Sequence, residues 1–587
     1  MAHELVIRGG TIVDGTGAEK FTGDVGVDGG RITAVGRAAG GGKGSGVTAH
    51  GAGRVIDADG LLVTPGWVDI HTHYDGQATW DEVLAPSSWH GVTTVVMGNC
   101  GVGFAPAMPD KHDWLIGLME GVEDIPGTAL AEGIQWEWET FPEYLDALSR
   151  RRWTMDVGTQ IAHGAVRAYV MGEPGAKNEP ANDDEIARMR DVVKEAIAAG
   201  ALGFSTSRTL GHRAIDGEPV PGTFAAEAEL FGIGSALGEL GRGVFELAPM
   251  GSAGEDIVAP EKEVDWMCRL SAAIDRPVTF ALLQVDLAPD LWRDLMEQSL
   301  KAVANGSRVY PQVAGRATGL LSGFQTTLCL FDVIPEYVRL RRTLSFDELI
   351  AALRTPEVRE RIVGAELDEQ TQLRLKSAYE RTFVLGSPPD YEPGPDKTLA
   401  AIAAREGRSP LDVAYDYMLA DDGRGMLHVP ILNYSQGSLE PIREMLLHPQ
   451  AALGLADGGT HCGVICDASM PTFMLTHWVR DRSRGDRLPL EWVIKKQTYD
   501  TARLYGMHDR GTIEPGMLAD FNLIDFDRLR IDGPEAVADL PAGGKRLVQR
   551  AHGYVATVKR GEVTFADGED TGVRPGSLVR GPQASPA

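Results

Sequence analysis

Residues 64–75 read TPGWVDIHTHYD and decide the interpretation of the fold. The apolar run Leu61–Ile70 has the length of a buried strand, and it ends in His71 and His73. Side chains two residues apart in a strand project from the same face, so both imidazoles can converge at the carboxyl end of this strand. Converging neutral imidazoles form a metal site, and Asp75 directly downstream favours that interpretation. The alternative is a pair of hydrogen-bonded core histidines.

Apolar runs of strand length alternate along the chain with segments of helical periodicity, such as residues 183–200 and 261–274. Parallel strands that are crossed by helices show this alternation. Eight such runs predict an α/β chain with a closed (β/α)8 TIM-like barrel and chemistry at the carboxyl ends of its strands. The runs are Leu61–Ile70, Val92–Gly98, Met155–Ala162, Ala201–Thr206, Gly243–Ala248, Pro277–Gln284, Arg308–Val313 and Ala451–Asp457.

Short strands with Gly and Asp turns occur at both ends of the chain and predict one small β-sandwich domain built from both ends. The glycine-rich stretch 38–53 is expected to be a flexible hairpin tip. The expected boundaries are 1–63 and 506–572 for the β-sandwich, 64–505 for the barrel with an insertion around 314–450, and 573–587 for a flexible tail.

The 587 residues carry 56 basic and 83 acidic side chains, a formal net charge of −27. This charge repels phosphates and anionic lipids, so we expect no nucleic acid or membrane partner. No apolar run approaches the roughly 20 residues of a membrane helix, and the start lacks a basic segment followed by an apolar one. Five scattered cysteines are not a disulfide framework. We therefore expect a soluble, cytoplasmic protein.

Two further residues follow strand runs and can ligate a metal. Cys100 comes directly after the second run, where a thiolate would be a strong zinc ligand; the alternative is a small buried thiol. Asp457 ends the eighth run, and a carboxylate there can bind a metal or take a proton from a water. An aspartate before two glycines is also a common turn former.

Residues on the substrate side are expected after the third and fourth runs. His163 and Arg167 follow the third run, and Ser207, Arg208 and His212 follow the fourth. The guanidinium group of an arginine suits a substrate carboxylate, and a histidine can donate to a developing oxyanion. Structural ion pairs or surface charges are the alternative for both arginines.

An aromatic and acidic segment after the second run contains Trp136 and Trp138, which could line a substrate pocket as part of a lid or belong to a packed loop. A second group of possible metal ligands has a spacing that matches no zinc pattern. It comprises His461, Cys462, Cys466 and Asp467.

Five segments together resemble the amidohydrolase superfamily and, within it, the D-aminoacylases (N-acyl-D-amino-acid deacylases). They are TPGWVDIHTHYD, GVTTVVMGNCGVGFAP, LMEGVEDIP, HGAVRAYVMG and RGTIEPGMLADFNLID, and the resemblance covers nearly the whole chain. It implies a metal-dependent barrel with a small β-sandwich that hydrolyses the amide of an N-acyl-D-amino acid. By this resemblance His71, His73 and Cys100 are metal ligands, and Asp457 is the general base and acid. His163 and Arg167 would lie on the substrate side.

The sequence departs from the family pattern in the middle of the barrel. The family usually supplies histidines from the fifth and sixth strands, but no histidine occurs between His212 and His428. The fourth run also carries no lysine that could bridge two metals. Three repairs are open: Glu246 or Gln284 as stand-in ligands, His212 or His461 reaching in from loops, or a single metal. We favour the last, with one Zn²⁺ per chain held by His71, His73, Cys100 and Asp457.

The leading hypothesis is therefore a metal-dependent amide hydrolase acting on a small amide that carries a carboxylate. Asp457 would activate water and protonate the leaving amine, and His163 or His212 would stabilise the oxyanion. A second hypothesis keeps the chemistry but changes the substrate to a cyclic amide, lactam or carbamate. A third is an inactive barrel that serves as a binding or scaffold protein. Association into a homo-oligomer is compatible with such a fold, but no segment specifies it.

Overall fold

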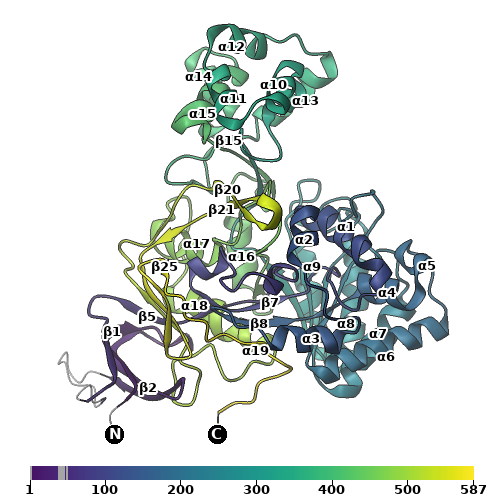
Figure 1. Ribbon diagram of the computed structural model, residues 1–587, viewed down its shortest axis with the longest axis vertical. Helices are drawn as coiled ribbons and strands as arrows, with labels where there is room; N and C mark the ends of the chain where they lie inside the picture. Colours follow the sequence, from purple (N-terminus) through teal and green to yellow (C-terminus); the bar gives the residue numbers. More distant parts are fainter. Residues whose placement is uncertain (1–2, 38–46, 48–50, 587) are drawn as a thin grey trace.

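The computed structural model describes residues 3–37, 47 and 51–586 (Figure 1). Most of the predicted hairpin tip at 38–53 lies outside the described residues. Both chain ends contribute to one nine-stranded sheet, because β5 pairs with the antiparallel β18 from the other end of the chain. The sheet comprises β1 (Leu5–Ile12), β2 (Phe21–Asp28), β3 (Arg31–Arg37), β4 (Arg54–Asp57), β5 (Leu62–Pro65), β18 (Phe521–Ile524), β23 (Tyr554–Lys559), β24 (Glu562–Ala566) and β25 (Glu569–Asp570).

Parallel strands form the centre of the molecule, and each overlaps one of the predicted apolar runs. One sheet has the order β6-β7-β8, and a second has the order β17-β13-β12-β11-β10-β9. Every residue of β7, β10 and β11 is buried, as expected when both faces of a parallel sheet are covered. The strands are β6 (Trp67–Asp69), β7 (Val92–Met97), β8 (Asp156–Thr159), β9 (Ile161–Ala162), β10 (Gly203–Ser207), β11 (Val244–Ala248), β12 (Val278–Ala281), β13 (Val309–Val313) and β17 (Ala452–Leu453).

The two parallel sheets meet at two places. β8 and β9 are both parts of the third predicted run and are separated only by Gln160. At the other end, Thr72 just beyond β6 forms a parallel bridge with Gly458 just beyond β17. This second junction brings together the carboxyl ends of the first and last strands.

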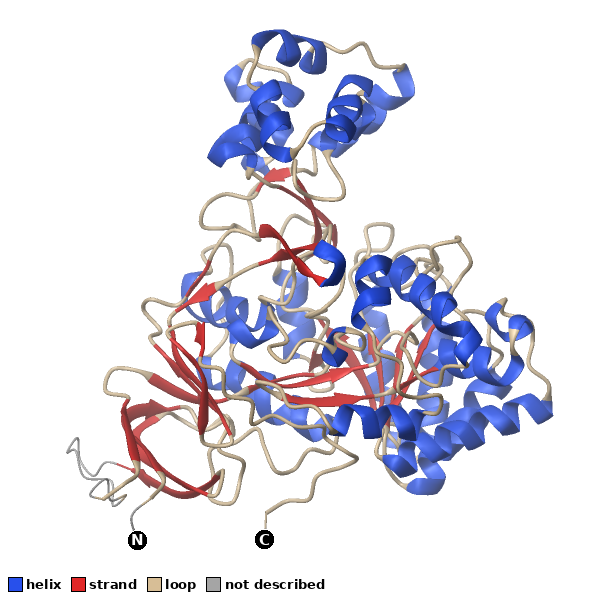
Figure 2. Cartoon of the chain, viewed as in Figure 1, coloured by secondary structure: helices blue, strands red, loops and turns tan. Residues whose placement is uncertain are grey.

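Helices connect and cover these strands, as the blue elements of Figure 2 show. The predicted helices at 183–200 and 261–274 are confirmed as α6 and α8. The side chains of Asn182 and Glu185 form a reciprocal capping box at the start of α6, and the helix ends before Gly200, whose φ is 123°. The helices are α1 (His112–Glu123), α2 (Gly127–Gly133), α3 (Phe141–Ser149), α4 (His163–Met171), α5 (Glu173–Ala176), α6 (Asp183–Ala199), α7 (Glu227–Leu240), α8 (Ala259–Ile274), α9 (Leu291–Ala302), α16 (Glu440–Leu447), α17 (Met470–Phe473), α18 (Leu490–Lys495) and α19 (Thr501–Leu504).

The segment predicted as an insertion builds a helical unit at the top of Figure 1. It stands on a three-stranded sheet of order β14-β16-β15 and packs around its own core, which includes Phe331, Tyr337 and Tyr415. Its elements are β14 (Thr318–Ser322), α10 (Pro335–Thr343), α11 (Phe346–Leu353), α12 (Pro356–Val363), α13 (Glu369–Tyr379), β15 (Phe383–Val384), α14 (Leu399–Glu406), α15 (Pro410–Gly423) and β16 (Leu427–Leu432).

Two short antiparallel pairs complete the described strands. They are β19 (Arg530–Ile531) with β22 (Ala551–His552), and β20 (Glu535–Leu540) with β21 (Gly544–Val548). Within the described residues, no helix combines the length and apolar character that crossing a bilayer requires.

The carboxyl-terminal segment, predicted as a flexible tail, runs along the parallel strands. Gly576 donates a backbone hydrogen bond to Trp153, Val579 donates to Val157 beside it, and Gln583 donates to Gly506. These hydrogen bonds satisfy backbone groups of the segment. The Gly-, Pro- and Ser-rich composition suggested a free end because composition does not show which backbone groups have partners elsewhere in the fold.

A buried ionic cluster joins β8 to the nine-stranded sheet. Asp156 is fully buried, and its carboxylate lies 2.8 Å from Lys559 Nζ and 2.8 Å from Arg510 Nη1. Lys559 is also fully buried and lies 2.7 Å from Asp520. The backbone amide of Ser577 donates to Asp156 at 2.8 Å. Despite its burial, Asp156 has a pKa below the usual range because Lys559 and Arg510 stabilise the carboxylate.

We predict that Asp156→Ala lowers the free energy of unfolding by about 3–5 kcal/mol, because it leaves two buried cations without their shared partner. Urea denaturation at neutral pH measures this change. Because folding lowers the pKa of Asp156, its contribution is fully present above the ordinary value of 3.8 and is lost as the pH falls below it. Asp146→Ala removes an exposed partner of Arg580 and is expected to change stability by less than about 1 kcal/mol. Equal effects of the two substitutions would contradict a structural role for the cluster.

Candidate metal centre

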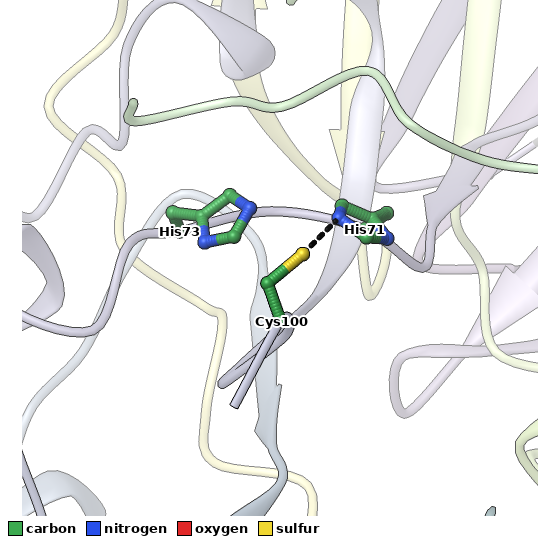
Figure 3. Close-up of side chains that lie close together, drawn as sticks. All are labelled: His71, His73 and Cys100. Carbon is green, nitrogen blue, oxygen red and sulfur yellow. Dashed lines mark hydrogen bonds between the residues drawn. The ribbon is translucent and has the colours of Figure 1, made fainter. Parts of the chain in front are cut away.

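His71 and His73 lie directly after β6, and both are buried. Their rings are 5.3 Å apart between centroids and inclined by 65° (Figure 3). The backbone amide of His73 donates to Gly458, and the carbonyl oxygen of His71 accepts from the amide of Asp457 at 3.1 Å. The bridge between the segments that follow β6 and β17 therefore holds the two histidines beside the aspartate.

Cys100 approaches the two histidines from the loop after β7. Its Sγ lies 3.4 Å from His71 Nε2 (Figure 3). Gly101 lets this loop pack closely, because a Cβ at that position would lie 2.6 Å from the backbone nitrogen of Ser207. Among the described residues, ligand atoms of His71, His73 and Cys100 form a group in which all lie within 4.8 Å of one another.

Asp457 completes a four-residue cluster. Its Oδ1 lies 3.4 Å from His71 Nε2 and 3.8 Å from His73 Nε2, and 18% of its side chain is exposed. At tetrahedral angles, zinc–nitrogen and zinc–oxygen bonds of about 2.0–2.1 Å separate two ligand atoms by about 3.4 Å. The cluster thus has donor types that zinc takes, and the separation of His71 Nε2 from Asp457 Oδ1 equals this tetrahedral value.

The backbone around this cluster adopts left-handed conformations at residues other than glycine. The φ angles are 55° at Cys100, 60° at Leu455, 50° at Asp457 and 53° at His461. Each such residue costs of order 1–3 kcal/mol and persists only where the surroundings determine it. Such strain concentrates at functional sites, which supports a functional role for this cluster.

Buried acids surround the histidines without a cationic partner. Burial raises the pKa of Glu123 to about 8 and that of Glu246 to about 8, and it raises the pKa of Asp457 well above its usual range. Burial also lowers the pKa of His71 to about 4. In the part of the chain that the structure describes, no lysine or arginine pairs with these three carboxyl groups. A bound metal cation would supply the missing positive charge.

Three further residues lie against the histidines, and of these the sequence interpretation had named only Glu246, as a possible stand-in ligand. Glu123, the last residue of α1, has its Oε1 3.2 Å from His73 Nδ1. Gln312 on β13 has its Oε1 2.9 Å from His71 Nδ1. Glu246 on β11 accepts from the amide of Cys100 at 2.9 Å, and its other oxygen lies 3.9 Å from His71 Nδ1. Strand position had pointed to Glu246, and Glu123 lies in the LMEGVEDIP segment that carries the family resemblance, whereas Gln312 belongs to none of the five quoted segments.

The structure does not bring His163 and Arg167 to the cluster. His163 Nδ1 lies 2.8 Å from the Thr206 hydroxyl group, and its Nε2 lies 2.9 Å from Glu229 Oε1. Arg167 is buried, pairs with the same Glu229 and donates to the carbonyl oxygen of Gly175. These contacts form a buried structural network, and a structural ion pair was the alternative interpretation of Arg167.

His212, in the loop after β10, lies close enough to the two histidines to affect their pKa values. Its Nδ1 lies 3.0 Å from the Ser207 hydroxyl group, and its charge is one of the causes that lower the pKa of His71 and His73. Arg208 instead pairs with Glu263 at 2.8 Å and is not free for a substrate.

The two predicted tryptophans belong to a packed aromatic loop. Trp138 is buried and donates through Nε1 to the carbonyl oxygen of Phe104 at 2.7 Å. Trp136 stacks on His112 with the ring centroids 3.8 Å apart.

The other proposed ligands have separate partners. Asp467 pairs with the buried Arg316, so it is engaged outside the cluster. Gln284 binds the backbone of Pro289 and Ser435. Cys462 and Cys466 are buried free thiols. His461 lowers the pKa of His71 and His73 electrostatically, as His212 does.

Comparison with known proteins identifies the family of this chain. The profile of the Amidohydrolase family matches residues 54–565, so the chain belongs to this family. The D-aminoacylase of Alcaligenes xylosoxydans xylosoxydans is 27% identical over 98% of this chain and 97% of that protein. The resemblance predicted from the motifs is thereby confirmed. So is the expectation that the chain is a hydrolase of carbon–nitrogen bonds other than peptide bonds.

Two solved structures share the fold of this chain. A D-aminoacylase crystal structure matches with a TM-score of 0.63 at 24% identity, covering 98% of this chain and 99% of that one. An N-acyl-D-glutamate deacylase from Bordetella bronchiseptica, solved with zinc and a phosphonate inhibitor, matches with a TM-score of 0.62 at 24% identity. That match covers 99% of this chain and 100% of the other.

Protein purified without added metal or chelator is expected to contain about one zinc per chain, measured by plasma mass spectrometry. His71→Ala and Cys100→Ala are each expected to lose this metal, because each removes one donor of the group. Cys462→Ala removes a buried thiol outside the group and should retain it. Metal loss in Cys462→Ala together with retention in Cys100→Ala would refute the assignment.

Proposed function

We propose that the chain is a metal-dependent hydrolase of N-acyl-D-amino acids with a single zinc at the mouth of a closed (β/α)8 barrel. The barrel would span 64–505, and the β domain would span 1–63 and 506–572. The observation that carries the proposal is the convergence of His71, His73 and Cys100 after the first and second parallel strands. Asp457, from the segment after the last strand, lies beside both histidines, with its Oδ1 3.4 Å from His71 Nε2 and 3.8 Å from His73 Nε2.

A divalent metal held by these residues supplies Lewis acidity toward an amide carbonyl and toward water. The residues of the chain carry out the proton transfers. Asp457 is the exposed member of the cluster, so its carboxylate can accept a proton from the attacking water and deliver it to the leaving amine nitrogen.

We assign stabilisation of the developing oxyanion to His212 rather than to His163. Both ring nitrogens of His163 are occupied by Thr206 and Glu229, whereas among the described residues His212 has a hydrogen-bond partner at Nδ1 only. A positioned donor of this type stabilises the charge that develops on the carbonyl oxygen.

One observation favours a second candidate, an amidohydrolase acting on a neutral cyclic or other small amide. The arginines expected to bind a substrate carboxylate are paired within the protein, Arg167 with Glu229 and Arg208 with Glu263. If no other cation takes their place, a substrate without a carboxylate suits the site better.

A panel of N-acetyl-D-amino acids, N-acetyl-L-amino acids and cyclic amides, assayed with the zinc-loaded enzyme, tests the proposal. We expect turnover of N-acetyl-D-amino acids, and turnover of cyclic amides alone would favour the second candidate. An enzyme that neither binds metal nor turns over any member would favour the binding-protein alternative.

We predict that Asp457→Asn lowers kcat by a factor of about 10²–10⁴ and retains at least part of the metal, because the amide cannot accept the proton. Steady-state kinetics and metal analysis of the same sample separate these two effects. Asp467→Asn changes a buried carboxyl group that pairs with Arg316 and is the matched control. Near-normal turnover by Asp457→Asn would remove the proton-transfer role.

A further inference from the structure

The Nδ1 atom of His71 points away from Cys100 and Asp457 and, among the described residues, has one hydrogen-bond partner. His71 Nδ1 lies 2.9 Å from Gln312 Oε1, and both side chains are buried. A carboxamide oxygen can only accept a hydrogen bond, so Nδ1 must carry the hydrogen and Nε2 must present its lone pair. Nε2 is the atom that lies 3.4 Å from both Cys100 Sγ and Asp457 Oδ1.

The backbone holds Gln312 in this position. Gln312 pairs in register with Ala452 of β17, so it belongs to the buried parallel sheet. Gly454 lies against its side chain, because a Cβ at Gly454 would come within 2.5 Å of Gln312 Oε1. The carboxamide therefore fits against His71 only while residue 454 has no side chain.

We propose that Gln312, seated against Gly454, is a positioning residue that fixes the Nδ1–H tautomer of His71 and thereby presents Nε2 to the metal. This inference rests on the proposed metal site and adds a residue to it that binds no metal itself. Partners of this kind fix the orientation of a ligating histidine and raise its basicity, and losing them weakens metal binding by about 10–100-fold.

Zinc affinity of the metal-free protein, measured by competition with a chromogenic chelator, tests the inference without relying on activity. Gln312→Leu removes the acceptor at similar volume and is expected to weaken zinc binding about 10–100-fold. Gly454→Ala leaves Gln312 chemically intact but displaces it, and it should weaken binding in the same direction. Gln312→Glu keeps an acceptor oxygen and should bind zinc within about threefold of the wild type, or more tightly.

The matched control is Gln284→Leu, which removes another buried glutamine whose partners are the backbone of Pro289 and Ser435. It should leave zinc affinity unchanged, and urea denaturation of all four variants should show that each is folded.

The outcomes separate the inference from the proposed function. A wild-type chain that binds no zinc would overturn the proposed function itself. Wild-type affinity in Gln312→Leu would overturn only the positioning role. Weak binding in both Gln312→Leu and Gln312→Glu would show that the amide donates to Nδ1 rather than accepting from it, which overturns the tautomer assignment.

Discussion

The bridge between the segments that follow the first and the last parallel strand is the constraint on which the candidate site depends. Two backbone hydrogen bonds, from Asp457 to His71 and from His73 to Gly458, tie together segments that are nearly 400 residues apart in the chain. They place a carboxylate beside two imidazoles before any metal binds. The left-handed conformations at Cys100 and Asp457 show that the fold holds these side chains at an energetic cost.

Burial then determines the electrostatic character of this site. Glu123 and Glu246 are removed from water and Asp457 is largely so, and each favours its neutral form because no positive group of the described chain compensates it. The Asp156 cluster on β8 shows the contrasting case. There the acid lies between Lys559 and Arg510, and its pKa falls below the usual range. The acid of the Asp156 cluster is paired with cations and joins two sheets. The acids of the candidate site have no lysine or arginine partner among the described residues.

Local sequence patterns were sufficient to predict the strands and the first group of site residues. Each apolar run overlaps a parallel strand, because a buried strand requires a short run of consecutive apolar residues and such a run is visible in the sequence. His71, His73 and Cys100 could be predicted because each follows such a run directly. Gln312 could not, since its only distinguishing property is contact with a histidine 241 positions away. The arginines show the same limit. The sequence does not reveal that Arg167 pairs with Glu229 or that Arg208 pairs with Glu263.

The geometry around His71 also bears on the number of metals. Glu246 occupies the fifth predicted run, where the family usually supplies a histidine. One of its oxygens accepts from the amide of Cys100, and the other lies 3.9 Å from His71 Nδ1. Nδ1 is the nitrogen that faces Gln312, and the opposite nitrogen, Nε2, faces Cys100 and Asp457. Glu246 therefore contacts the backbone of Cys100 and the Nδ1 side of His71, and it does not lie among the candidate ligand atoms. Glu246 thus adds no ligand on the Nε2 side of His71, which supports the proposal of a single metal.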